Sequence, residues 1–329
     1  MKKTLAFIAI IIALAAGHFL SKAALIEDVN ISLKWVHQAQ FAGMYVAQEE
    51  GFYKDNRLKV GFKEFNFDST PADDLKNGTV EFALMSSEEF LTHVSRGEDF
   101  MAVAAFYQIS PYALVSLEKG NIMTPADFGG MVLGNKGGKA EEELIYRLLM
   151  KEFGLTDKDV EIKTLGFEKR EIDDLVDGDA DAVDVYRTDQ IYFFEKEGVE
   201  YNIIYPERYG VNINNDLLVV NRSLINENPE IVENFIMASV EGWEYAFTNP
   251  QSAIKSTLKY VTSEEYKDEE YELFILQSSE PLIKPSSRSR IGDISVKNMS
   301  DLYEVMKENG FITKDLNISD FYTREYIPY

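Results

Sequence analysis

The chain repeats one hydrophobic pattern, in which a short apolar strand leads through a polar turn into an amphipathic helix. Apolar and polar residues alternate over 31–35, which predicts a strand, and over 42–49 the apolar residues take helical spacing before Gly51. The same order of elements returns with predicted strands at 80–85, 131–134 and 180–186 and predicted helices at 88–95, 140–153 and 189–197. This alternation predicts an α/β fold with largely parallel sheets.

Two interruptions divide this pattern. Ser110 and Pro111 precede an apolar stretch at 112–117, and a polar run at 212–216 precedes another at 217–220. We predict that the chain crosses between two lobes near residues 110 and 213, with a cleft between the lobes. Lobe 1 is then expected to consist of residues 24–111 and 214–329, and lobe 2 of residues 112–213.

The last third of the chain is predicted to be helical. Asn228-Pro229 and Asn249-Pro250 each place a capping residue before a proline, which suits the first position of a helix. Between these two signals the apolar residues keep one face of a long helix, and we expect that face to be core. The acidic stretch 262–271 is predicted to be a solvated helical face.

Residues 1–23 have the layout of a secretory signal peptide. Two lysines precede an uncharged apolar core at 5–16, and Ser21-Lys22-Ala23 resembles a signal peptidase site. An uncleaved membrane anchor is the alternative, and in either case the rest of the chain is expected outside the cytoplasm. The chain has no cysteine, so it can form no disulfide and carries no cysteine for a lipid tether. These features favour the periplasm of a cell with two membranes.

The charge of the chain limits its partners. Cleavage after Ala23 would remove three lysines and no acid, which leaves 30 basic and 56 acidic residues and a net charge of −26. Such an acidic surface repels nucleic acid and anionic lipid, so neither is expected as a partner. The 45% share of apolar residues is sufficient for a packed globular protein of this length.

No catalytic or metal-binding constellation is visible in the sequence. The chain has three histidines and no cysteine, and it lacks the motifs of zinc proteases, serine hydrolases, P-loops and dinucleotide-binding turns. We therefore predict that the protein is not an enzyme and holds no metal or cofactor. Its expected partner is a small-molecule ligand.

The candidate ligand-binding residues lie where predicted strands lead into helices, which is where open α/β sheets bind ligands. Aromatic side chains there offer flat faces for stacking, and amides, hydroxyls and acids offer hydrogen bonds. Each has a structural alternative, which is core packing for the rings and helix capping or a favourable helix dipole for the polar residues. The candidates are Trp35, Gln38, Gln40, Phe41, Ser86, Ser87, Tyr107, Gly137, Gly138, Glu141, Tyr186, Thr188 and Asp189.

Several sequence runs resemble one known family. The run WVHQAQFAGMYVAQEEGFYKDNRLKV at 35–60 is similar to the opening of periplasmic binding proteins of the NMT1/THI5 type, and the likeness continues at 106–116 (FYQISPYALVS), 124–134 (TPADFGGMVLG), 209–212 (YGVN) and 242–246 (GWEYA). Two positions depart from the family pattern. His37 stands where relatives often have proline, and Thr188-Asp189-Gln190-Ile191 stands where they often have Thr-Asn-Glu-Pro.

The resemblance implies a two-lobed periplasmic binding protein fold of type II that closes over its ligand by a hinge. It implies a solute-binding protein of an ABC importer, with a thiamine-precursor pyrimidine or a riboflavin-like solute as ligand and an inner-membrane ABC permease as partner. A ligand sensor that presents the closed form to a membrane signalling protein is the alternative. A third class is a pyrimidine-synthesis enzyme of the same superfamily, which carries a cysteine-rich motif that this chain lacks.

Overall fold

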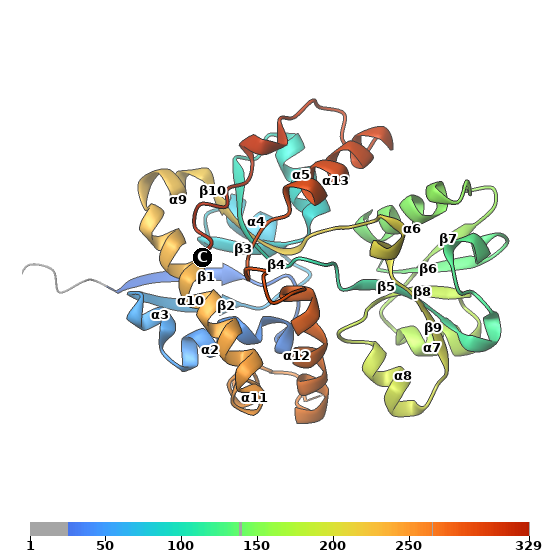
Figure 1. Cartoon of the computed structure of the whole chain (residues 1–329), viewed down its shortest axis with the longest axis horizontal. Helices are drawn as coiled ribbons and strands as arrows, with labels where there is room; N and C mark the ends of the chain where they lie inside the picture. The colour runs from blue at the N-terminus through green and yellow to red at the C-terminus, as the bar shows by residue number, and fades with distance from the viewer. Residues whose placement is uncertain (1–25, 138–139, 265, 329) are drawn as a thin grey trace, which may run out of the picture.

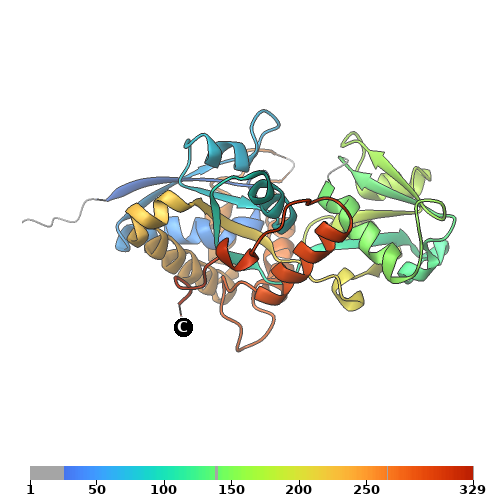
Figure 2. The same cartoon turned by 90° about the horizontal axis from the view of Figure 1, so that it is seen from above.

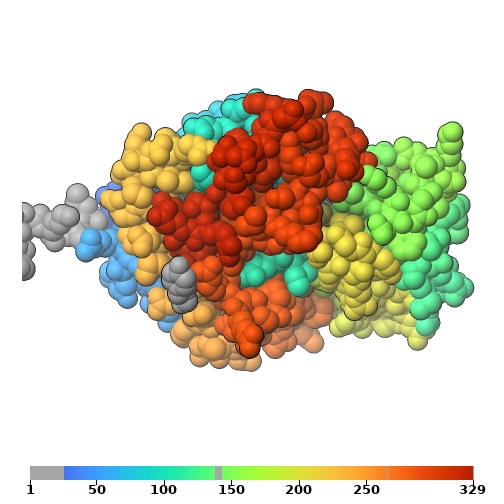
Figure 3. Space-filling view, turned by 45° about the horizontal axis from the view of Figure 1, so that its top comes forward, coloured from blue at the N-terminus to red at the C-terminus, as the bar shows by residue number. Residues whose placement is uncertain are grey.

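The computed structural model describes residues 26–137, 140–264 and 266–328. These residues form two lobes that lie side by side along the longest axis of the molecule (Figure 1). Each lobe is built on one five-stranded sheet with helices packed against it. Figure 3 shows that the C-terminal part of the chain, which includes α13 (Val296–Glu308), covers one face of lobe 1 and extends to lobe 2.

The sheet of lobe 1 has the strand order β2-β1-β3-β10-β4. β1 is parallel to β2 and β3, whereas β10 runs antiparallel to its neighbours β3 and β4. A strand that follows lobe 2 in the chain therefore lies inside the sheet of lobe 1. The bounds are β1 Glu27–Ser32, β2 Leu58–Lys63, β3 Phe82–Met85, β4 Phe100–Tyr107 and β10 Asn215–Asn221.

The sheet of lobe 2 has the order β7-β6-β8-β5-β9. β6 is parallel to β7 and β8, and β5 is antiparallel to β8 and β9. Both sheets are thus mixed rather than largely parallel, because the strands that follow the two crossings, β5 and β10, run against their neighbours. The bounds are β5 Tyr112–Leu117, β6 Val132–Lys136, β7 Glu161–Leu165, β8 Ala182–Tyr186 and β9 Tyr201–Ile204.

Most helices belong to lobe 1. They are α2 Ala42–Glu49, α3 Phe52–Asp55, α4 Pro71–Lys76, α5 Ser87–Arg96, α9 Arg222–Glu227, α10 Pro229–Thr248, α11 Pro250–Thr257, α12 Glu269–Ile283 and α13. The helices of lobe 2 are α6 Ala140–Glu152, α7 Glu171–Asp177 and α8 Ile191–Glu197. Short 3-10 turns occur at Ala39–Phe41, Glu118–Gly120, Pro125–Phe128, Pro206–Tyr209 and Ile318–Asp320.

Two glycines let α2 and α10 pack in close contact. A Cβ atom at Gly242 would lie 2.0 Å from the carbonyl oxygen of Gly43, and a Cβ atom at Gly43 would lie 2.3 Å from the ring of Trp243. A side chain at either position would push the helices apart. Because α2 follows directly on the turn at Ala39–Phe41, this contact also fixes that turn on the core of lobe 1.

The lobes also touch through α13. Lys151 of α6 and Glu308 of α13 form an ion pair of 2.7 Å between lobe 2 and lobe 1. Figure 2 shows α13 lying at the junction of the two lobes, beside α6. Apolar side chains of α6 and α13 share one buried cluster, so the lobes are in contact through core residues as well as through charged ones.

The helix after β8 begins later than expected. α8 starts at Ile191 rather than at residue 189, and the residue before it, Gln190, makes no capping hydrogen bond with its side chain. Instead, the Gln190 Oε1 atom accepts the N–H of Tyr186 at 2.6 Å and holds a turn between strand and helix. Thr188 is therefore not the helix cap, and its side chain is buried.

The acidic stretch 262–271 is largely solvated, as expected, but most of it is not helical. α12 begins only at Glu269, where the side chain of Asp268 accepts the N–H groups of Glu270 and Tyr271. Tyr271 and Glu272 are then buried at 2% and 0% exposure. The acidic composition could not reveal this, because exposed Glu269 and Glu270 and buried Glu272 are residues of the same type on one helix.

No helix in the described ranges is long and apolar enough to cross a membrane. The signal peptide expected at 1–23 lies outside those ranges.

Candidate functional site

A cleft of about 560 Å³ lies between the lobes. It is lined by residues that follow β1 and β2 in lobe 1, by residues at the carboxyl ends of β6, β7 and β8 in lobe 2, and by Tyr266 and Tyr271 near the start of α12. This volume lies within the range of pockets that bind small molecules. The cleft is therefore the candidate ligand site.

The lobe 1 wall of the cleft is aromatic. Trp35 stacks on Phe65 with 5.8 Å between ring centroids and 21° between ring planes, and Phe67 packs edge-on against Phe65. Trp35 follows β1, and the two phenylalanines follow β2, which is the parallel neighbour of β1. Parallel strands end at the same edge of a sheet, so the rings are brought together by the sheet itself. They provide a flat apolar face for stacking.

Next to the rings lies an amide pair. Gln38 donates from Nε2 to Gln40 Oε1 at 3.0 Å, and Gln40 donates from Nε2 to Asp216 Oδ2 at 2.8 Å. Both glutamines are almost fully buried. Within the described part of the chain the Gln38 Oε1 atom has no hydrogen-bond partner. A buried acceptor that lines a cleft and lacks a donor is a candidate contact for a ligand.

Two acids, buried Glu272 and partly exposed Glu64, hold the turn that carries these amides. The N–H of Ala39 donates to Glu272 Oε2 at 2.5 Å, and the N–H of His37 donates to Glu64 Oε1 at 2.8 Å. Burial raises the pKa of Glu272 to about 8. The turn is thus attached to α12 by a carboxyl group that desolvation keeps largely protonated at neutral pH.

Lys34 connects the two lobes at the bottom of the aromatic wall. Its Nζ atom donates to Asn215 Oδ1 at 2.6 Å and to the Tyr186 hydroxyl at 2.8 Å, and it lies 3.5 Å from Asp216 Oδ1. Asn215 and Asp216 begin β10 in lobe 1, whereas Tyr186 ends β8 in lobe 2. One ammonium group therefore joins the strand ends of both sheets.

The lobe 2 wall is shaped by a second buried lysine. Lys136 donates from Nζ to the carbonyl oxygens of Gly166 and Lys169 at 2.7 and 2.8 Å, and to Asp174 Oδ2 at 2.7 Å. These bonds hold the loop between β7 and α7, which presents Phe167 to the cleft. The Phe167 ring lies 6.3 Å from the ring of Trp35 on the other lobe. Two aromatic faces thus meet across the cleft.

Gly137 lies beneath the Phe167 ring. It has a φ of +68°, which favours glycine, and a Cβ atom there would come within 2.6 Å of the ring. Gly137 thus makes room for Phe167 and is not itself a lining residue.

Three acids of the lobe 2 wall have environments that disfavour their charge. Asp184 accepts the N–H of Lys136 at 3.1 Å and the Tyr146 hydroxyl at 3.3 Å, and burial raises its pKa to about 7. Burial also raises the pKa of Asp189 to about 7, although this acid accepts the hydroxyl of Tyr271 from lobe 1. The pKa of Glu171 is raised by burial as well.

The structure brings together some of the residues predicted from the sequence. Those that line the cleft are Trp35, Gln38, Gln40, Tyr186 and Asp189. Gly138 and the side chain of Glu141 lie outside the described residues.

The other predicted residues do not line the cleft, because each has a structural contact elsewhere. Phe41 is buried in the core of lobe 1, and Tyr107 is buried with its hydroxyl 2.6 Å from the Ser279 hydroxyl. Ser86 caps α5, where it accepts the N–H of Glu89 at 3.2 Å. Ser87 donates to the carbonyl oxygen of Asn214, and Thr188 is buried outside the cleft lining.

Sequence reasoning missed several lining residues. They are Lys34, Phe65, Phe67, Lys136, Phe167, Glu171, Asp184 and Tyr271. Most follow the carboxyl end of a strand or lie within its last residues. The signal that could have found them is the tendency of open α/β sheets to bind ligands at the carboxyl ends of their strands. The strands β2 and β7, at 58–63 and 161–165, are not among the strands predicted from the sequence, so the residues that follow them were not candidates.

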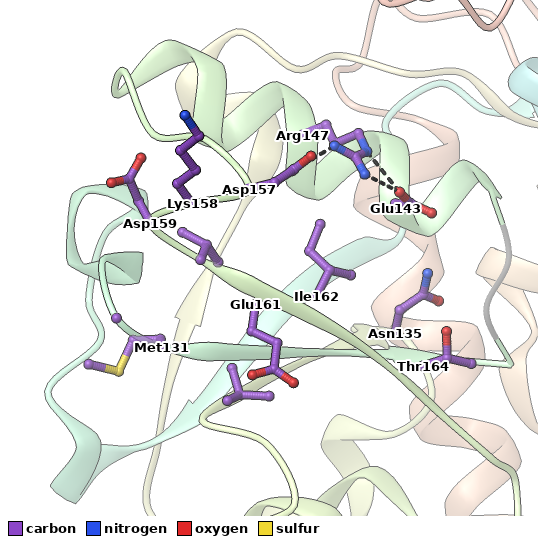
Figure 4. A pocket seen from close by; sticks show the side chains of 13 residues that line it. Met131, Asn135, Glu143, Arg147, Asp157, Lys158, Asp159, Glu161, Ile162 and Thr164 are labelled. Atoms are coloured by element: carbon purple, nitrogen blue, oxygen red, sulfur yellow. Dashed lines mark hydrogen bonds and ion pairs between the residues drawn. The ribbon is translucent and has the colours of Figure 1, made fainter.

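A second hollow of about 590 Å³ lies on the outer side of lobe 2, between β7 and α6 (Figure 4). Its lining contains no aromatic side chain. The charged groups there satisfy one another, since Arg147 bonds both Glu143 and Asp157. It shares no lining residue with the cleft and offers no wall for stacking.

The fold is shared with solved periplasmic binding proteins. The periplasmic aliphatic sulphonate binding protein SsuA from Escherichia coli is similar over 90% of this chain and 91% of its own, with a TM-score of 0.69 and 13% identity. The desulfurization enzyme DSZB is similar over 91% of this chain and 97% of its own, with a TM-score of 0.60 and 10% identity. At such identities the likeness establishes the two-lobed fold of this class.

Relatives by sequence carry names of binding proteins. The riboflavin-binding protein RibY of Chloroflexus aurantiacus is 23% identical over 92% of this chain and 87% of its own length. The formylaminopyrimidine-binding protein of Halalkalibacterium halodurans is 25% identical over 71% of this chain and 70% of its own. The family model described as NMT1/THI5 like matches residues 38–253, which is more than half of the chain. The chain therefore belongs to the NMT1/THI5-like family of periplasmic binding proteins.

Proposed function

We propose that this protein is the extracytoplasmic solute-binding component of an ABC importer, and that it encloses a small heteroaromatic solute between its lobes. The observation that carries the proposal is the aromatic face of Trp35 and Phe65, which lies opposite Phe167 in a cleft between the lobes. Stacking on flat rings, with a few polar groups to fix the edge of the ligand, is how such pockets bind heterocycles.

The function also requires that the lobes close over the solute. Contacts between the lobes support this, because Lys34 bonds Tyr186 and Tyr271 bonds Asp189 across the cleft. The chain passes between the lobes at 108–111 and 205–214, and these two segments are the proposed hinge. A solute that touches both walls would bind the closed form better and would shift the equilibrium toward it.

Transport defines the proposed partners. The closed, loaded form would dock on an ABC permease in the inner membrane, and a membrane sensor would receive the same form if the protein signalled instead. Export requires processing near Ala24, and amino-terminal sequencing of the secreted protein tests this step. An intact Met1 in a membrane fraction would favour the anchored form.

The decisive experiment is a ligand screen on the purified exported protein. Riboflavin, a thiamine-precursor aminopyrimidine and a small aliphatic sulfonate are compared by thermal shift and titration calorimetry. A ligand at 100 times its dissociation constant should stabilise the protein by about 2.7 kcal/mol. The flat-ring compounds are expected to stabilise the protein, and small-angle scattering should then show a smaller radius of gyration. A response to the sulfonate alone would overturn the heteroaromatic assignment.

A further inference from the structure

The four cationic side chains that line the cleft within the described ranges all have protein partners. Lys34 bonds Asn215 and Tyr186, and Lys136 bonds two carbonyl oxygens and Asp174. Lys169 forms ion pairs with Asp177 and Asp179 at 2.7 and 2.6 Å, and Arg170 bonds Asp173 with two nitrogens and also Glu197. None of these charges is left for a negatively charged ligand.

Three acids that line the cleft, in contrast to its cations, form no ion pair with the protein among the described residues. Among the described residues, no Lys or Arg nitrogen lies within 4.0 Å of a carboxylate oxygen of Glu171, Asp184 or Asp189. The three are close enough to influence one another, since the charge of Glu171 contributes to the raised pKa of both Asp184 and Asp189. Lobe 2 thus presents to the cleft carboxyl groups that form no ion pair among the described residues, although the charges of Lys136 and Arg170 act on Glu171 from farther away and partly oppose the rise of its pKa.

Gln38 provides a separate observation on lobe 1. Its carbonyl oxygen lines the cleft, is buried and accepts no hydrogen bond in the described structure, while the side-chain nitrogen donates to Gln40. Gln38 is 1% exposed, so water outside the cleft does not reach it. A buried acceptor without a donor is unfavourable by about 1–3 kcal/mol, and a ligand that supplies an N–H or O–H removes this cost.

We propose that the cleft selects a planar solute whose edge carries hydrogen-bond donors and no negative charge, with Asp184, Glu171 and Gln38 as the acceptors that recognise this edge. This inference rests on the proposed function and adds the chemical class of the solute. An anionic substituent would meet uncompensated acids and engaged cations, so discrimination arises from repulsion as well as from unmatched acceptors. Phosphorylated and sulfonated forms of the solute are therefore excluded.

Riboflavin and its 5′-phosphate are a suitable pair of probes, because they share one ring system and differ by a phosphate. Titration calorimetry at pH 7.5 should give an affinity for riboflavin at least about tenfold higher than for the phosphate. The thiamine-precursor hydroxymethyl aminopyrimidine and its phosphate form a second pair. Equal affinity within the pair that binds would overturn the inference while leaving the proposed function intact.

Variants separate charge from size, since an isosteric amide removes the acid and leaves the shape. Glu171→Gln and Asp184→Asn should each narrow the preference for riboflavin over its phosphate by at least about threefold, because repulsion is relieved. Glu152→Gln is the matched control, because Glu152 is exposed on α6 of lobe 2, carries the same charge and does not line the cleft. This control should leave the ratio of the affinities for riboflavin and its phosphate within about twofold of the wild-type ratio.

The outcomes are distinct. A preference that survives both amide variants would mean that the phosphate is excluded by its size, and the charge argument would be wrong. Failure of every planar probe to bind would reject the proposed function and this inference together. Thermal unfolding of each variant shows whether it is folded, and Glu171→Gln, at a partly exposed position, serves if Asp184→Asn does not fold.

Discussion

Each wall of the cleft contains a lysine that bonds several protein groups, but the two lysines act differently. Lys34 of lobe 1 lies beside buried Asp216 and reaches across to Tyr186, so it neutralises an acid and connects the lobes. Lys136 of lobe 2 bonds within its own lobe and holds the loop that carries Phe167. Asp184, which also lines that wall, has no comparable cation.

This difference separates stability from selectivity. Charge on the lobe 1 wall is compensated within the protein, so its removal should affect folding. On the lobe 2 wall, Glu171 and Asp184 form no ion pair among the described residues, so removal of their charge should affect the choice of ligand. The following variants test this separation.

The largest effect is expected from Lys34→Met. It leaves Asp216, whose side chain is 2% exposed, as a buried acid without its cation, and the free energy of unfolding should fall by about 3 kcal/mol or more. Urea denaturation measures it. Lys59→Met is the control, because its ion pair with Asp28 is exposed at 71% and 74% and should contribute little to stability. The double variant Lys34→Met/Asp216→Asn should regain most of the loss, and a wild-type midpoint for the single variant would contradict the pairing.

Trp35→Ala tests the stacking face. Affinity for the heteroaromatic ligand should fall by more than about tenfold, because one stacking partner is worth about 0.5–1.5 kcal/mol beyond the apolar area that is lost. Titration calorimetry measures the change. Phe153→Ala removes an aromatic ring that does not line the cleft and should bind normally. Unchanged binding together with lowered stability would make Trp35 a core residue.

Tyr271→Phe tests the contact between the walls. The hydroxyl that it removes donates to Asp189 across the cleft, and one hydrogen bond is worth about 1 kcal/mol, so affinity should fall about fivefold. Small-angle scattering of the ligand-bound variant should show a smaller fraction of closed molecules than in ligand-bound wild type. Tyr192→Phe serves as the control, since that hydroxyl bonds Lys196 within lobe 2. If both variants bind alike, the bond to Asp189 does not stabilise the closed form.

The fourth test measures how the free energy of unfolding depends on pH. The pKa of Asp184 rises from 3.8 to about 7 on folding, so the folded state binds an additional proton between these values. The stabilisation is therefore complete below pH 4 and is lost as pH rises through 7. Between pH 4 and 7 the unfolding free energy of Asp184→Asn should fall less steeply with pH than that of wild type, by a slope that corresponds to up to about one bound proton. Above pH 7 the two curves should be parallel. Glu168→Gln controls for the change in net charge, and identical slopes for wild type and Asp184→Asn would refute the shift.

The elements that follow from the sequence are those with a clear local signal. β5 lies at Tyr112–Leu117 as its apolar run predicts, and α2 and α10 begin and end where helical spacing and proline indicate. The face of α10 expected to be core is buried. The two-lobed fold and the family also agree with the sequence analysis.

The site was less accessible to the sequence, because its geometry depends on residues far apart in the chain. Lys34 and Asn215 are 181 positions apart, and only the insertion of β10 into the first sheet brings them together. Phe41 and Phe167 both follow a strand, yet one is core and one lines the cleft. The hydrophobic pattern cannot predict whether an aromatic ring in a turn packs into the core or lines the cleft, since apolar side chains are found in both places.

The position of β10 has a consequence for how the chain folds. Its partners β3 and β4 are made more than a hundred residues earlier, so β10 cannot pair with them until all of lobe 2 has emerged. Pairing over such separations is slow, because a long loop must close before its contacts form. The strands of lobe 2 come from one continuous stretch and are free of this delay. Completion of lobe 1 is therefore expected to be the late step of folding, after the sheet of lobe 2 has formed.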